Sequence, residues 1–246
     1  MKKYHLDDMS LNRFRKDGFL GPLPLIDREE MVRFRSVIEL ILKKDSCKSV
    51  AERKHNRHLD NSTIYDLASH PGIVDRISSI YGRDLLLWRT NFFVKNPGSK
   101  EIPWHQDHNY WPLEPPIVAS AWIAIDDSTK KNGCVQVIPG SHRTVLPHIP
   151  ADDDMEFQEM GDSRYVDQTQ LINLEMEAGE FIIFNERTVH HSNANVSTKR
   201  RIGLAVRMIL PIVKVLNWDS PDHALIQVSG NDSMGLNRIA KPPTTN

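Results

Sequence analysis

The chain has 246 residues, enough for one domain with a sizeable hydrophobic core. Its 31 basic and 32 acidic side chains nearly cancel, which excludes a protein that binds nucleic acid through a strong positive charge. It has no apolar run long enough for a signal peptide or a membrane span, and its two cysteines, Cys47 and Cys134, are too few for a disulfide framework. We therefore expect a cytoplasmic protein with no nucleic-acid or membrane partner.

Three helices are predicted in the first third of the chain. Ser10 is a suitable N-cap for a short helix that Gly18 would end. Asp27 is a suitable cap for a longer helix, because apolar residues recur at helical spacing after it. Residues 45–62 are polar and predict a loop, and the apolar spacing predicts a third helix over about 70–81.

Short β-rich runs alternate with turn residues from about residue 85 onwards. The runs are 85–95, 117–126, 134–138, 171–175, 180–184, 202–210 and 212–217. Many short strands after a helical start predict a mainly β protein, an antiparallel barrel or jelly roll with flanking α-helices. We expect a single domain over 1–246, with a helical N-terminal part over about 1–84 and a jelly-roll core over about 85–230. Residues 150–168 are acidic and poor in apolar side chains, and predict a long, functional or disordered loop.

A candidate metal site begins with His105 and Asp107, which are two residues apart. On a strand, such residues point to the same side and can face one cavity. His190 follows an apolar run, residues 181–184, that predicts a buried strand leading to the same cavity. Two imidazoles and one carboxylate can occupy one face of an octahedral ferrous ion and leave three positions open. His191 competes with its neighbour for the ligand role, and zinc is an alternative metal for such a set.

Arg201 opens a predicted strand. A fixed guanidinium beside such a metal can pair with the distal carboxylate of 2-oxoglutarate. If Arg201 faces inward, the alternation of a strand places Gly203, Ala205 and Arg207 on the same side. The two small residues would then leave room for a ligand, while Arg200 on the opposite face would be solvated.

Several stretches resemble one known family. They are 104–111 (WHQDHNYW), 121–127 with 132–134 (AWIAIDD and NGC), 137–143 (VIPGSHR), 190–197 (HHSNANVS) with Arg201, and the opening 14–20 (FRKDGFL). Together, and in this order along nearly the whole chain, they resemble the phytanoyl-CoA dioxygenase family of iron- and 2-oxoglutarate-dependent oxygenases. The resemblance implies a double-stranded β-helix, the cupin-like jelly roll. It also implies that His105, Asp107 and His190 bind Fe(II), which selects His190 over His191.

The same resemblance implies that 2-oxoglutarate and O2 are cosubstrates. Arg201 would hold the distal carboxylate of 2-oxoglutarate with Ser192 beside it, and Asn91 lies where some members place a polar contact. The expected reaction is hydroxylation of an unactivated C–H bond, with release of succinate and CO2. In related halogenases a Gly or Ala stands in place of the carboxylate, so Asp107 favours hydroxylation over halogenation. Desaturation, epoxidation and cyclisation are alternatives within the family.

The substrate is not named by the sequence. Asn109, Tyr110 and Trp111 follow the metal motif and could line the substrate pocket, with core packing as the alternative for Trp111. Arg89 and Arg207 could pair with an acidic group of the substrate, with plain surface exposure as the alternative for Arg89. We expect a small metabolite or natural-product intermediate, with a CoA-linked acyl group as the alternative. A zinc-binding or non-catalytic jelly roll is the rival outside the family, and the sequence carries no signal for the oligomeric state.

Overall fold

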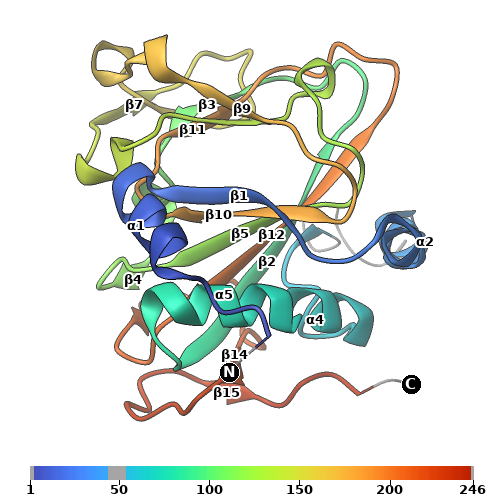
Figure 1. The fold of residues 1–246 in the computed structure, drawn as a ribbon, viewed down its shortest axis with the longest axis vertical. Coiled ribbons are helices and arrows are strands. Elements are labelled where there is room, and N and C mark those ends of the chain that lie inside the picture. Colours follow the sequence, from blue (N-terminus) through green and yellow to red (C-terminus); the bar gives the residue numbers. More distant parts are fainter. Residues whose placement is uncertain (1–2, 44–53, 245–246) are drawn as a thin grey trace.

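A computed structural model describes residues 3–43 and 54–244 of the protein. Two sheets face each other, antiparallel throughout except for one parallel pair of strands at an edge of the larger sheet, and helices cover the outer face of the larger one (Figure 1). The larger sheet contains, in spatial order, β1 (Phe19–Pro24), β10 (Glu180–Asn185), β5 (Ala119–Ala124), β12 (Arg201–Ile209), β2 (Leu85–Lys95), β14 (Leu225–Ser229) and β15 (Ile239–Ala240). The smaller sheet contains β3 (Ile102–His105), β11 (His190–Ser192), β6 (Val135–Val137) and β9 (Ile172–Leu174). The predicted fold class, mainly β with flanking helices in a jelly roll, is confirmed.

Two short ladders complete the strands: β4 (Leu113–Glu114) pairs with β13 (Lys214–Val215), and β7 (His148–Pro150) pairs with β8 (Glu159–Gly161). The predicted runs at 85–95 and 180–184 are confirmed almost residue for residue as β2 and β10. The run predicted over 212–217 shrinks to the two residues of β13. Residues 150–168 are largely irregular, as predicted, but β8 lies within them.

The helices are α1 (Asp8–Asp17), α2 (Arg28–Lys43), α4 (Ser62–Ala68) and α5 (Pro71–Tyr81). The predicted cap Ser10 is wrong, because Asp7 caps α1 and its carboxylate accepts the backbone N–H of Ser10 at 2.8 Å. Gly18 ends α1 with φ +82°, the left-handed conformation that favours glycine. The carboxylate of Asp27 accepts the N–H of Glu30, as expected of a cap. Helix α4 was not predicted, and residues 45–53 of the loop predicted over 45–62 lie outside the described residues.

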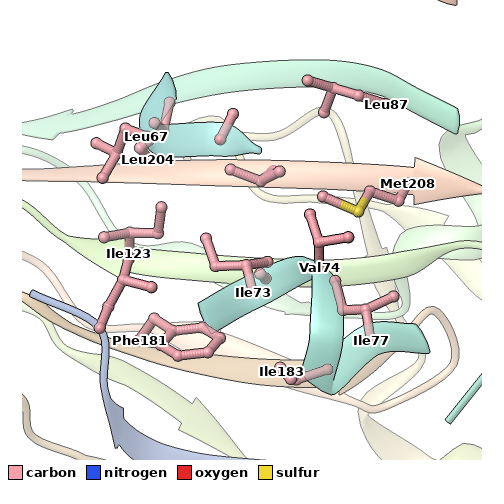
Figure 2. Close-up of a cluster of buried hydrophobic side chains, with 14 of the residues drawn as sticks. Leu67, Ile73, Val74, Ile77, Leu87, Ile123, Phe181, Ile183, Leu204 and Met208 are labelled. Atoms are coloured by element: carbon pink, nitrogen blue, oxygen red, sulfur yellow. The ribbon is translucent and has the colours of Figure 1, made fainter. Parts of the chain in front are cut away.

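The larger sheet buries both of its faces. Along β10, Phe181 and Ile183 point to the outer face and pack in one hydrophobic cluster, while Ile182 and Phe184 point inward and pack in another. Figure 2 shows the outer cluster, in which Ile73, Val74 and Ile77 of α5 meet Ile123, Leu204 and Met208 of the sheet. This alternation follows from the period of two along a strand. The inward face, turned towards the smaller sheet, is left to build a cavity.

Across residues 3–43 and 54–244, no helix combines the length and apolar character needed to cross a membrane.

Candidate metal centre

The three predicted metal ligands come together between the two sheets. His190 of β11 lies opposite His105 of β3 in the antiparallel ladder, and their ring centroids are 4.1 Å apart. Asp107 opens a single 3-10 turn (Asp107–Tyr110) just after β3, instead of continuing the strand as predicted. Its Oδ1 lies 3.7 Å from Nε2 of His105 and 3.9 Å from Nε2 of His190. One ligand atom from each residue lies within 4.8 Å of the others, a spacing that a single metal ion can span.

Backbone carbonyls orient the two imidazoles. Nδ1 of His105 lies 2.8 Å from the carbonyl of Pro103, and Nδ1 of His190 lies 2.9 Å from that of Thr188. Because a carbonyl only accepts, each Nδ1 carries the proton and each Nε2 keeps a lone pair for a metal. Burial lowers the pKa of His190 to about 3, so this imidazole is neutral at physiological pH. Burial opposes ionisation of Asp107, but Arg207 and the two imidazoles hold the pKa of its carboxyl below the usual range.

His191, the rival ligand, is engaged elsewhere. Its Nδ1 lies 2.8 Å from Oε1 of Gln136, and its ring stacks on Trp104 with centroids 4.7 Å apart. Its Nε2 lies 3.4 Å from a carboxylate oxygen of Glu101. Both ring nitrogens therefore have partners, and the cluster of ligand atoms found among the described residues contains His190 and not its neighbour.

Arg201 faces the same inner cavity as the three ligands. Its side chain is only 1% exposed, yet its Nε and Nη2 have no hydrogen-bond partner, and neither has the nearby hydroxyl of Ser192. Burial lowers the pKa of Arg201 to about 10, which still leaves the guanidinium charged at neutral pH. A buried charged group with unmade hydrogen bonds is costly, so this arrangement is suited to an anionic ligand.

Gly203, two residues after Arg201, makes room for the side chain of Trp122. A Cβ added at Gly203 would overlap the indole of Trp122, and that indole lies 5.0 Å from the guanidinium carbon of Arg201. The expectation that Gly203 leaves room for a ligand is therefore wrong, because Trp122 fills the space. Ala205 and Arg207 do line the inner cavity, as the alternation predicted.

Replacing Gly203 with alanine is expected to destabilise the protein by about 1–3 kcal/mol, because a methyl group must displace a packed ring. Urea unfolding followed by far-UV circular dichroism measures this loss. The same substitution made in a Trp122→Phe background should cost less, because the smaller ring leaves space. Equal costs in both backgrounds would contradict the overlap.

An outer cavity of about 540 Å³ adjoins the inner one, and its lining includes Arg89, Asn91, Tyr110, Trp111 and Arg207. Asn91 thus faces this cavity, with its buried amide oxygen unpartnered, and is absent from the lining of the inner one. Asn109 is absent from the lining of both cavities and donates to a carboxylate oxygen of Glu159 at 3.0 Å.

The two arginines of the outer cavity have different partners. Nε of Arg89 donates to Asp219 at 3.0 Å, so an acidic group of the protein already neutralises this arginine. Nη2 of Arg207 lies 3.4 Å from Oδ2 of Asp107, and its guanidinium carbon lies 4.7 Å from the ring centre of Trp111. Trp111 in turn meets Trp88 edge to face.

Sequence reasoning missed three residues of this region. Phe157 lies in the long acidic loop, yet its ring is 5.0 Å from that of His105 and it lines both cavities. Its signal was an aromatic side chain in a mostly polar loop. His55 lines the outer cavity and Asp219 holds Arg89, and neither carries a motif that would have revealed it.

Known proteins share this architecture. A family model described as phytanoyl-CoA dioxygenase matches residues 14–203. A probable phytanoyl-CoA dioxygenase of Caenorhabditis elegans is 31% identical over 147 residues, which cover 55% of this chain and 47% of that protein. The ectoine dioxygenase of Nocardia farcinica is 27% identical over 215 residues, covering 76% and 72% of the two chains. The chain spans about half the length of the C. elegans, rice and Arabidopsis phytanoyl-CoA dioxygenases that it matches.

Among solved structures, that of CytC3 with Fe(II) and alpha-ketoglutarate superposes with a TM-score of 0.76 at 27% identity, covering 96% of this chain and 93% of that one. The family model, which matches most of the chain, and the agreement in fold lead to one conclusion: the chain belongs to the phytanoyl-CoA dioxygenase family.

Proposed function

We propose that the protein is an Fe(II)- and 2-oxoglutarate-dependent dioxygenase. It uses O2 to hydroxylate an unactivated C–H bond of a small metabolite or natural-product intermediate, and it releases succinate and CO2. His105, Asp107 and His190 hold the iron. Arg201 binds the distal carboxylate of 2-oxoglutarate, with Ser192 beside it.

The observation that carries this proposal is the buried guanidinium of Arg201, whose donors are unpartnered in the cavity that also holds the three ligand atoms. Two imidazoles and a carboxylate suit zinc as well as iron. A zinc ion alone does not account for the buried, unpartnered guanidinium in the same cavity. A dicarboxylic cosubstrate accounts for both features, because one end can reach the metal and the other the guanidinium.

The protein's own residues position and enclose the reactants. Iron, when bound, supplies the redox chemistry that couples decarboxylation of 2-oxoglutarate to oxidation of the substrate. Apolar side chains of the inner cavity, such as Phe93, Phe157 and Phe184, keep bulk water away. Asp107 occupies the ligand position that a halogenase leaves vacant, which favours hydroxylation. Product analysis separates hydroxylation from desaturation, epoxidation and cyclisation.

The size of the outer cavity supports a small substrate, since about 540 Å³ lies within the usual range for metabolite sites. Its relatives include a probable hypophosphite dioxygenase, a phytanoyl-CoA dioxygenase and an ectoine dioxygenase, so the family relationship alone selects none of these substrate classes. A CoA-linked acyl substrate is therefore kept as the alternative to a free small metabolite. The cytoplasmic location and the contact of Asn91 with the cosubstrate stay predictions.

Anaerobic titration of the apoprotein with Fe(II) and then 2-oxoglutarate tests the proposal. We expect a weak visible charge-transfer absorption band when both are bound, and succinate formation coupled to O2 uptake once air is admitted. Metal binding without the band and without succinate would overturn the dioxygenase and leave a zinc-binding or non-catalytic jelly roll.

A further inference from the structure

The register of two central strands places positive charge at both ends of one inward face. Along β12 and β2 the facing pairs are Arg201 with Lys95, Gly203 with Phe93, Ala205 with Asn91, and Arg207 with Arg89. Because alternate residues of a strand share a face, these pairs form one row. A basic pair lies at each end of the row and uncharged residues lie between them.

The basic residues of this row differ in how many hydrogen-bond and ion-pair partners they have. The ammonium group of Lys95 donates to three backbone carbonyls, those of Lys100, Ser192 and Asn193. Arg89 is paired with Asp219. Arg207, in contrast, is only 6% exposed and its buried Nε has no hydrogen-bond partner. Arg207 therefore resembles Arg201 in being a buried arginine with an unpartnered nitrogen, at the other end of the row.

The negative charge beside Arg207 is shared with the metal site. Nη2 of Arg207 lies 3.4 Å from Oδ2 of Asp107, a long distance for an ion pair. A metal ion bound by Asp107 draws on the same charge, which leaves the guanidinium incompletely compensated. Trp111 covers one face of the guanidinium, so its edge remains for hydrogen bonding.

We propose that Arg207 forms a second anion site, facing the outer cavity, that binds a compact oxyanion group of the substrate, a carboxylate or a phosphonate. This proposal rests on the proposed function and narrows its substrate class. The side-chain amide of Asn91 lines the same cavity, and its nitrogen, not its oxygen, is the atom that can donate to an oxyanion. Because Arg207 contacts a metal ligand, the C–H bond that is oxidised lies only a few bonds from the anionic group. A CoA thioester, whose charges lie far from its acyl carbons, does not fit this site.

Matched small probes test the site. The protein is loaded with Mn(II), a paramagnetic substitute for iron, and saturated with 2-oxoglutarate so that Arg201 is occupied. Proton relaxation of acetate, methylphosphonate and acetamide is then measured. We expect faster relaxation of the methyl protons of at least one anion and none for acetamide, which has nearly the same shape without the charge. The stronger of the two anions identifies the preferred group. Equal effects of acetate and acetamide would overturn the proposal.

An anion bound directly to the metal would also relax faster, so variants separate the two cases. Arg207→Met should weaken anion binding by about 10-fold or more, because it removes charge-assisted hydrogen bonds. Arg164→Met, which removes an arginine paired with Asp162 on the surface, should leave it unchanged. Anion relaxation that persists in Arg207→Met would place the anion on the metal and overturn the proposal.

The experiment also separates this proposal from the proposed function. Mn(II) and 2-oxoglutarate binding are measured in the same samples before any probe is added. If 2-oxoglutarate does not bind, the dioxygenase proposal fails, while the comparison of acetate with acetamide in wild type and Arg207→Met still tests the anion site. If 2-oxoglutarate binds and the anions do not, only the second site is wrong.

Discussion

Replacing Arg201 with alanine will weaken the binding of 2-oxoglutarate to the Fe(II)-loaded protein by at least about 100-fold. The guanidinium is buried and has two nitrogens free for a carboxylate, and losing two hydrogen bonds to a charged group costs about 3 kcal/mol or more. Anaerobic titration, followed through the visible absorption band of the complex, measures this affinity.

The adjacent Arg200 provides a matched control. It immediately precedes β12, pairs with Glu39 of α2 and is absent from the lining of the inner cavity. Arg200→Ala should leave the affinity for 2-oxoglutarate within about 2-fold of wild type, because it removes only a partly exposed ion pair that contributes little free energy. An Arg201→Ala variant that also stays within this range would show that the guanidinium does not bind the cosubstrate.

Replacing His190 with glutamine will lower the affinity for Fe(II) by more than about 100-fold, because even outer partners of metal ligands contribute 10- to 100-fold. Among residues 3–43 and 54–244, His190 supplies one of the three ligand atoms that come together, and its Nε2 lies 3.9 Å from Oδ1 of Asp107. Anaerobic calorimetry with Fe(II), repeated with Co(II), measures the affinity.

His191→Gln is the corresponding control, since it changes the neighbouring histidine of the same strand. It removes the stacking on Trp104 and alters the hydrogen bond to Gln136, so a loss of stability of about 1 kcal/mol is expected. Its metal affinity should remain near that of wild type. The reverse result, with metal lost from His191→Gln and kept in His190→Gln, would exchange the roles of the two histidines.

Long periodic elements were predictable from the sequence, and short ones were not. The apolar alternation and spacing of β2, β10 and α5 extend over enough residues to identify each element. β3 and β11 have only four and three residues, which is too short for a period to emerge. Their conformation depends on the ladder between them, a contact between distant parts of the chain.

Some residues of the candidate site were likewise predictable from the sequence, and others were not. The three metal ligands and Arg201 were predicted because their residue types and spacing resemble those of one family, and this resemblance selected His190 over His191. The positions of Phe157 and Asp219 depend on how loops return to the sheets, which no local pattern encodes. The filling of space at Gly203 depends on the pairing of β12 with β5, which brings Trp122 across it.

The strands β2 and β12 contribute residues to both cavities, and connecting segments complete the outer one. His190, Ser192 and Arg201, on the cosubstrate side, lie on paired strands. Trp111, Phe157 and Asp219, on the substrate side, lie in connecting segments between strands. Connecting segments accept insertions and exchanges far more readily than hydrogen-bonded strands do. Exchanging these segments can therefore reshape the outer cavity, while the β3–β11 ladder that carries His105 and His190 stays in place.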